Sequence, residues 1–322
     1  RDEPACPYCG MARPGSRLKA NWWTQHLQSP DGLIKAIIFT NVGFYVLALL
    51  LNPRGFGFSM NPMNFLSPAN NTLFILGATG RYPIDQIWPG ITGIPGIGWL
   101  TLLTANFLHG SLLHILFNML VLRQIAFLTI REFGIYRMLI IYLLSGAGGF
   151  LLSYLAGVSF TIGASAAVCG LIGAMIYFGK ARGGVYGNLV YRQIGGWAIG
   201  LLIIGFMPGI NNWGHAGGFL TGLGLAFLLG YHEKRRETFG HKAIAGICVM
   251  VTTVVLIGSA TEREVCEQVA KDLPVADLAG QTNIDETMAI VNRASLKTKH
   301  QRLTRLIEGL EKVIEDGPRI SE

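Results

Sequence analysis

Seven long apolar segments constrain this chain more than any other feature of its sequence. They lie near residues 33–51, 105–124, 135–156, 163–181, 190–208, 213–231 and 242–259. A helix needs about 20 mostly apolar residues to cross the hydrocarbon core of a bilayer. Only 14% of the 322 residues are charged, whereas soluble domains carry about a quarter. The sequence therefore predicts an all-α, multi-pass membrane protein with the lipid bilayer as a partner.

The basic residues predict an orientation for these segments. They gather before the first segment and in every second connection after it, at Arg13, Arg17, Lys19, Arg131, Arg137, Lys180, Arg182, Arg192, Lys234, Arg235 and Arg236. The connections 157–162 and 209–212 contain no Lys or Arg. Short basic loops stay in the cytoplasm, so we expect a cytoplasmic N-terminus, an external C-terminus and a bacterial plasma membrane. This distribution also explains the net charge of +7 without a nucleic-acid partner.

Polar residues at membrane depth are the next informative feature. Ser165 begins the fourth segment and His215 begins the sixth, while His109, His114 and Asn118 lie in the first part of the second. These three segments run in the same direction, so all five side chains should lie in the outer half of the membrane. Polar residues are costly there and commonly mark a functional site.

The residue types fit nucleophilic catalysis. A serine hydroxyl becomes a useful nucleophile when a base accepts its proton, and histidine suits that task. His114 and Asn118 are four residues apart, so they share one helix face and can donate together to an oxyanion. No Asp or Glu occurs inside any proposed span. The pattern therefore favours a Ser165–His215 dyad over a triad.

Small residues offer a way to bring the two segments together. They recur at every fourth position, at Ala166, Gly170 and Ala174 in one segment and at Gly214, Gly218 and Gly222 in the other. This spacing lets two helix backbones approach closely. We expect the fourth and sixth helices to be in contact.

These motifs resemble the rhomboid family of intramembrane serine proteases. The resemblance covers roughly residues 33–232 and rests on the ordered appearance of His109, His114 and Asn118, then Gly163-Ala164-Ser165, then Gly214-His215-Ala216-Gly217-Gly218. It implies a six-helix bundle plus a seventh C-terminal helix. It also implies Ser165 as nucleophile, His215 as base, His114 and Asn118 as oxyanion donors, and His109, Gly163 and Gly218 as structural residues near the site, with His109 also able to bind water.

The chain departs from the family pattern at three places. Ala166 follows the nucleophile where glycine is common, and Cys169 stands where an aromatic residue often packs on the histidine. Trp99-Leu100 replaces a frequent Trp-Arg pair in the first loop. None of the three removes the nucleophile or the base.

The resulting hypothesis is an endopeptidase that cleaves single-span membrane proteins without a cofactor. The alternatives are an inactive rhomboid-like protein that binds membrane clients, and a transporter, which the missing membrane carboxylates and repeats disfavour. The expected layout is a cytoplasmic segment 1–32, a catalytic membrane domain 33–232, an additional helix 233–260 and an external helical tail 261–322. The first loop, 52–104, is expected to hold an interfacial hairpin with Trp88 and Trp99 at headgroup level.

Cys6 and Cys9 form a Cys-x-x-Cys pair in the N-terminal segment. Four-ligand zinc sites need a second pair, and none lies nearby in the sequence. The pair is therefore either half of a zinc site or an ordinary pair without metal.

Overall fold

The computed structural model describes residues 29–51, 65–87, 97–206, 209–231 and 237–261. Their long helices are α2 (Pro30–Leu51), α6 (Leu112–Phe133), α7 (Ile135–Leu155), α8 (Ser165–Arg182), α9 (Gly184–Ile204), α10 (Asn212–Leu229) and α11 (Phe239–Thr261). Short helical turns are α3 (Asn70–Ile75), η2 (Pro83–Ile87), η3 (Ile97–Leu100), α5 (Thr101–Thr104) and η4 (Ala105–Phe107). Cys6, Cys9, Trp88 and nearly all of the tail 261–322 lie outside the described residues.

Each of the long helices corresponds to one predicted apolar segment. Four of those described, α2, α6, α7 and α11, are long and apolar enough to cross a membrane. Polar residues and glycines lower the mean hydropathy of α8, α9 and α10. The described residues therefore form a mostly helical protein, in which an isolated bridge joins Thr79 and Thr161. The count of six spans plus one stays a prediction.

The predicted start of the second span was wrong. Residues Ala105–Phe107 form a separate turn, and α6 begins only at Leu112. The physical reason is a cap, because the Ser111 hydroxyl accepts a hydrogen bond from the backbone N–H of His114 at 3.2 Å. His109 consequently lies just before the helix. The fifth helix is also shifted, to Gly184–Ile204.

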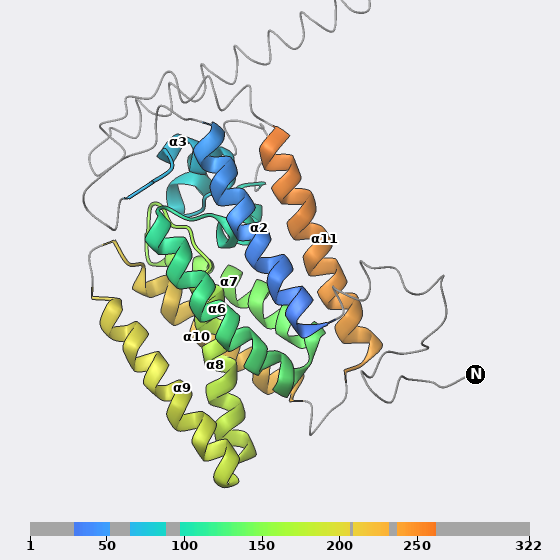
Figure 1. The fold of residues 1–322 in the computed structure, drawn as a ribbon. Helices are drawn as coiled ribbons and strands as arrows, with labels where there is room; N and C mark the ends of the chain where they lie inside the picture. Colours follow the sequence, from blue (N-terminus) through green and yellow to red (C-terminus); the bar gives the residue numbers. More distant parts are fainter. Residues whose placement is uncertain (1–28, 52–64, 88–96, 207–208, 232–236, 262–322) are drawn as a thin grey trace, which may run out of the picture.

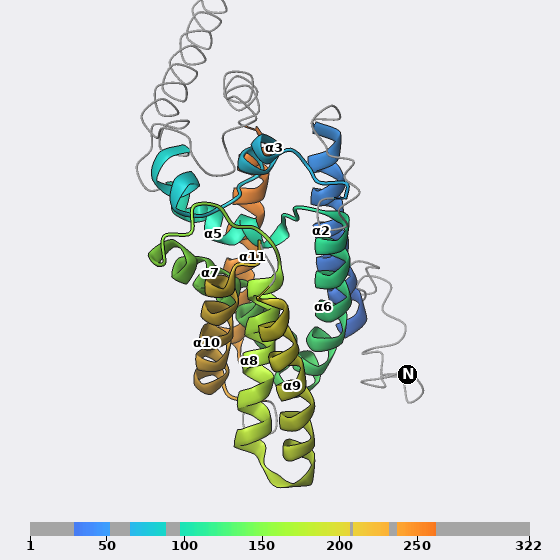
Figure 2. The same ribbon diagram turned by 90° about the vertical axis from the view of Figure 1, so that its left-hand side faces the viewer.

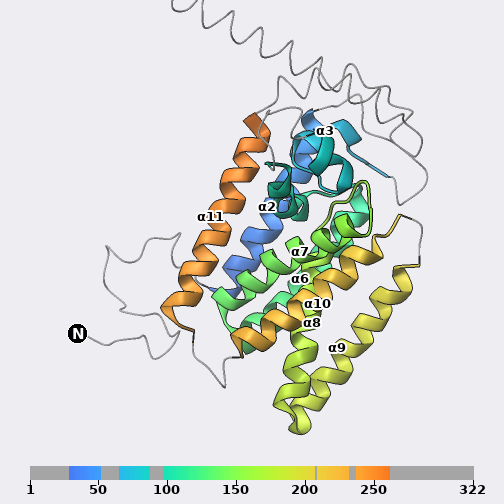
Figure 3. The ribbon, with the colours of Figure 1, turned by 180° about the vertical axis from the view of Figure 1, so that it is seen from behind.

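Helices α7, α8 and α10 form the centre of the bundle. Each packs against the other two, and α10 lies alongside α7 and in front of α8 when the molecule is seen from behind (Figure 3). α9 lies beside α8 on one side of this unit, and α2 and α11 lie on the other side (Figure 1). The short helices gather at one end of the bundle, above α7 and α8 (Figure 2).

Glycine allows the central helices to approach closely. A Cβ atom added to Gly218 would overlap the backbone oxygen of Ala166, and one added to Gly222 would overlap that of Gly170. The predicted contact between the fourth and sixth helices is therefore confirmed. The structure adds α7 to it, because a Cβ at Gly149 would lie 2.5 Å from the oxygen of Gly214.

The segment before α11 is tied to the start of α7. One carboxylate oxygen of Glu237 accepts the backbone N–H groups of Tyr136 at 2.8 Å and Arg137 at 3.0 Å. Negative charge is favourable at a helix N-terminus, where N–H groups lack partners within the helix. The fully buried Arg137 side chain also donates to the backbone oxygen of Gly230 at 3.0 Å. Together these bonds join the start of α7 to the end of α10 and the approach to α11.

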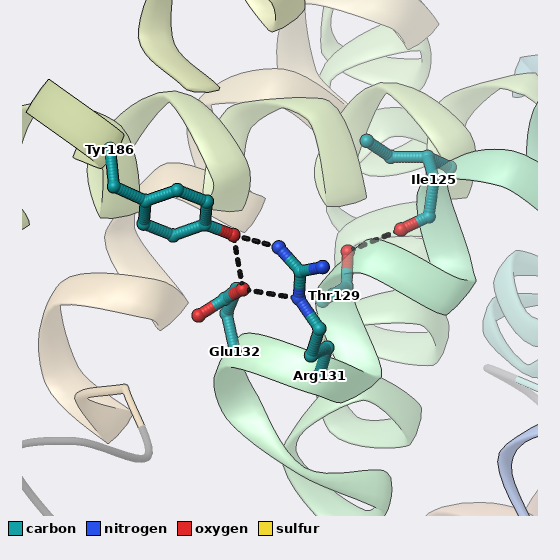
Figure 4. A network of polar contacts seen from close by, with 5 residues as sticks. All are labelled: Ile125, Thr129, Arg131, Glu132 and Tyr186. Carbon is teal, nitrogen blue, oxygen red and sulfur yellow. Dashed lines mark hydrogen bonds and ion pairs between the residues drawn. The ribbon is translucent and has the colours of Figure 1, made fainter. Parts of the chain in front are cut away.

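A polar cluster joins the end of α6 to the start of α9 (Figure 4). The Tyr186 hydroxyl donates to Glu132 at 2.6 Å, and Arg131 bonds to both Glu132 and Tyr186. The guanidinium groups of Arg131 and Arg182 lie 5.5 and 5.3 Å from the Tyr186 ring centre. Such pairs hold helix ends together most effectively where water is partly excluded.

The described part of the first loop packs onto the bundle. Leu73 and Leu76 are buried. Trp99 is 41% exposed, and the centre of its ring lies 4.7 Å from the centre of the Tyr154 ring. The Tyr154 hydroxyl donates to Asp85 at 2.9 Å. These contacts anchor the loop to the end of α7; the predicted interfacial hairpin with Trp99 at headgroup level stays a prediction.

Candidate active site

Ser165 and His215 meet in the structure. Their side chains are joined at 2.9 Å between Oγ of Ser165 and Nε2 of His215. Ser165 is the first residue of α8, and His215 lies in the first turn of α10. Both are partly exposed, so the pair can be reached. This distance lies within the reach that a general base needs to accept a hydroxyl proton.

The close packing of the two helices places the pair. Gly218 lies one turn after His215 and rests against the backbone of Ala166, the residue after Ser165. Because backbone atoms meet directly there, the two helix starts have little freedom to slide apart. The departure at Ala166 is accommodated within this contact, since its small side chain packs beside Gly149.

His114 lies against the chain that leads to Ser165. A Cβ atom on Gly163 would be 2.6 Å from His114 Nε2, and Gly163 has a φ of +119°. The backbone N–H of Gly110 donates to His114 Nδ1 at 3.3 Å. A neutral imidazole that accepts at Nδ1 carries its proton on Nε2. His114 can therefore offer an N–H donor two residues before the serine.

The other two polar residues of this region have different surroundings. Asn118 is buried one turn after His114, and its side-chain amide donates to the backbone oxygen of His114 at 2.8 Å. His109 is fully buried, with its ring centre 5.0 Å from that of His114 in an edge-to-face contact. The structure thus places both beside His114.

No carboxylate among the described residues hydrogen-bonds to the His215 ring, whose recorded side-chain partner is Ser165. The same residues contain no group of three or more His, Cys, Asp or Glu side chains that could hold a metal ion. Cys169 is buried in α8, four residues after Ser165, and Leu100 is 38% exposed. The chemistry available here is that of a hydroxyl, an imidazole and nearby N–H donors.

Sequence reasoning missed several residues that shape the site. Ser111 caps α6, Asn211 caps α10, and Gly149 brings α7 against α10. Ser and Asn directly before an apolar run are helix-start signals, so the two caps could have been found. Gly149 carries no comparable signal, because glycine is frequent in apolar helices.

Comparison with known proteins agrees with these features. The Rhomboid domain family model matches residues 97–232. The chain is 33% identical to RHOMBOID-like protein 4 of Arabidopsis thaliana over 61% of its own length and 52% of that protein. It is 33% identical to RHOMBOID-like protein 2 of the same plant, over 64% of its own length and 71% of that protein. It is 31% identical to Rhomboid protease GluP of Bacillus subtilis (strain 168), over 48% of its own length and 31% of that protein.

The match covers only part of some relatives, since the chain spans about half the length of RHOMBOID-like protein 4. It spans 71% of RHOMBOID-like protein 2. The residues that the family model matches, 97–232, include Ser165, His215, His114 and Asn118. Together with the apolar helices, these matches show an integral membrane protein that belongs to the rhomboid family.

Proposed function

We propose that this protein is an intramembrane serine endopeptidase. The observation that carries the proposal is the 2.9 Å contact between the Ser165 hydroxyl and the His215 imidazole. The name of the Bacillus relative, a rhomboid protease, supports the same reaction class. Family membership supplies the context, and the pair supplies a nucleophile with its base.

The reaction proceeds in two halves. His215 Nε2 accepts the hydroxyl proton while Ser165 Oγ attacks the carbonyl carbon of the scissile amide. The resulting oxyanion is stabilised by the His114 Nε2–H, by Asn118 and by the backbone N–H of Ser165 at the start of α8. His215 then gives its proton to the leaving amine, and an acyl-enzyme remains. Water releases the acyl group with His215 again acting as base.

The substrates proposed are single-span membrane proteins, cut within or beside their membrane segment. The proposal includes the six-plus-one helix arrangement, with residues 33–232 as the catalytic domain. It also includes a cytoplasmic N-terminus, an external C-terminus and a bacterial plasma membrane. The support for the orientation is the alternation of basic connections along the chain.

The test is cleavage of labelled single-span substrates by the full chain reconstituted in lipid vesicles. Ser165→Ala and His215→Ala should each lower the cleavage rate by about 10³-fold or more. Ser159→Ala, which changes an exposed serine in the segment before α8, should leave it unchanged. Equal cleavage by wild type and Ser165→Ala would overturn the proposal. Labelling of Ser165 by a fluorophosphonate is an independent measure of its reactivity.

An inactive client-binding protein is the second candidate. The observation that favours it is Cys169, which stands where the family often has an aromatic residue that packs on the histidine. The names of the plant relatives also state no activity. In that case, the wild type and Ser165→Ala should retain the same single-span proteins equally, and neither should cleave them.

A further inference from the structure

We infer that Asn211 is a positioning residue that holds His215 against Ser165 by tying the segments leading to both. The inference rests on the proposed protease reaction and deepens it. Asn211 lies four residues before His215, and Thr161, one of its partners, lies four residues before Ser165. One side-chain amide thus connects the approaches to the nucleophile and the base.

The oxygen atoms of Asn211 hold the first turn of α10. Its side-chain oxygen accepts the backbone N–H of Gly214 at 3.1 Å. Its backbone oxygen accepts the N–H of His215 itself at 3.2 Å. These bonds satisfy N–H groups that a helix start leaves without partners. They also fix the backbone from which the His215 ring projects.

The side-chain nitrogen of Asn211 makes two bonds to other parts of the protein. It donates to Ser153 Oγ in α7 and to Thr161 Oγ1, both at 2.8 Å. An amide nitrogen carries two hydrogens, so both are used. The Ser153 hydroxyl donates its own hydrogen to the backbone oxygen of Gly149 at 3.0 Å, which leaves it free to accept from Asn211.

The two anchors are themselves held firmly. Ser153 is fully buried and Thr161 is 5% exposed. The Thr161 backbone exchanges two hydrogen bonds with Thr79, at 2.7 and 3.2 Å. Thr79 in turn accepts a hydrogen bond from the Thr101 hydroxyl at 2.8 Å. The amide of Asn211 therefore connects α10 to rigid parts of the fold on both sides.

A cap alone would not need asparagine. Serine caps a helix about as well as asparagine, but its shorter side chain cannot also reach Ser153 and Thr161. Asn211→Ser therefore separates capping from the link between the two approaches. If capping is the whole role, serine restores the wild-type site, and if the link matters, serine fails.

The experiment uses the full chain in lipid vesicles and measures kcat and KM for a single-span substrate, with the fluorophosphonate labelling rate of Ser165. We expect Asn211→Ser and Asn211→Ala to lower kcat and the labelling rate by about 10- to 100-fold, because small displacements of reacting groups are costly. KM should change by less than about 3-fold, since the substrate contacts remain. Wild-type kcat and labelling in Asn211→Ser would overturn the inference.

Two further variants sharpen the result. Asn212 is the matched control, because its side chain donates instead to Gly205 at the end of α9, at 2.8 Å; Asn212→Ala should leave the labelling rate of Ser165 unchanged. Thr161→Val as a single change should lower the labelling rate of Ser165. Combined with Asn211→Ser it should cause no further loss, because both changes remove the same hydrogen bond. Additive losses would overturn the link.

The outcome also distinguishes this inference from the proposed function. If the wild type neither cleaves nor labels, the protease proposal fails. The link between Asn211 and Thr161 is then tested by thermal unfolding of the same two variants and their combination. Non-additive shifts in Tm support the link, and additive shifts overturn it.

Discussion

Both α10 and the second half of α9 are rich in glycine, but the glycines of the two helices differ in what surrounds them. Gly218 and Gly222 of α10 lie against the backbone of α8, where no Cβ atom fits. Gly195, Gly196 and Gly200 of α9 have nothing within 4 Å of a Cβ position. Glycine in a membrane helix therefore indicates close packing only where a partner helix is present.

The packing of α9 changes along its length. Its buried residues, Gly187, Val190 and Ile194, all lie in the first half. Near its start, a Cβ on Gly179 of α8 would lie 2.8 Å from the backbone nitrogen of Tyr191. The fully buried residues of α9 thus lie in its first half, whereas Trp197, Ala198 and Leu201 of its second half pack against the core while only partly buried.

The largest effect is expected for Gly218→Ala. Its new Cβ would meet a backbone oxygen of α8, which cannot rotate away, so α10 must shift with His215. Overpacking of this kind costs about 1–3 kcal/mol or more, and misplacing a base can cost about 100-fold in rate. Thermal unfolding measures the loss of stability, and substrate cleavage measures the loss of rate. Gly224→Ala on the same helix, where a Cβ meets open space, is the control and should behave like wild type; equal results for the two variants would contradict the comparison.

A smaller loss is expected for Gly163→Ala. The change adds a clash with His114 to the strain of a positive φ, which costs about 1–3 kcal/mol. We expect cleavage to fall by about 10-fold or more as the donor moves. Gly157→Ala shares the positive φ, at +81°, but has only an Arg81 nitrogen at 3.9 Å. It should lose stability and keep its cleavage rate, and a matching loss of cleavage would argue against a role for His114.

The opposite sign is expected for Gly200→Ala in α9. Alanine is favoured over glycine in a helix interior by about 0.5–1 kcal/mol, and nothing blocks the new methyl group. Thermal unfolding should therefore occur at a higher temperature than in wild type. A lower unfolding temperature would show that this half of α9 has a close neighbour after all.

The smallest effect is expected for Tyr186→Phe near the start of α9. The change removes the hydroxyl bonded to Glu132 and Arg131 but keeps the ring beside both guanidinium groups. Because Arg131 is half exposed, the loss should be about 0.5 kcal/mol. Salt near 1 M should shrink the difference in unfolding temperature between the two proteins; an undiminished difference would mean that charge contributes little there.

The sequence supported some of these features well. The start of α8 at Ser165 and the contact between α8 and α10 were predictable, because apolar length and four-residue spacing of small side chains are local patterns. The placement of His109 inside the second span was wrong, since a capped helix start can interrupt an apolar run. The contribution of α7 through Gly149 and Ser153 could not be predicted, because it depends on which helices become neighbours.

In the candidate active site, too, some features were predictable from local sequence patterns and others were not. Ser165 and His215 were identified from their cost at membrane depth, and the structure brings them together. The link through Asn211 joins residues 50 and 58 positions apart in the chain. No local pattern encodes such a pairing, since it arises only when three segments meet.

The carboxylate of Glu237 at the start of α7 has a consequence for biosynthesis. Its partners, Tyr136 and Arg137, are 101 and 100 residues earlier in the chain. When α7 emerges from the ribosome, its first turn has no carboxylate to accept these two N–H groups. The start of α7 is completed only after α8, α9 and α10 have been made, so the segment before α11 closes the assembly of the bundle.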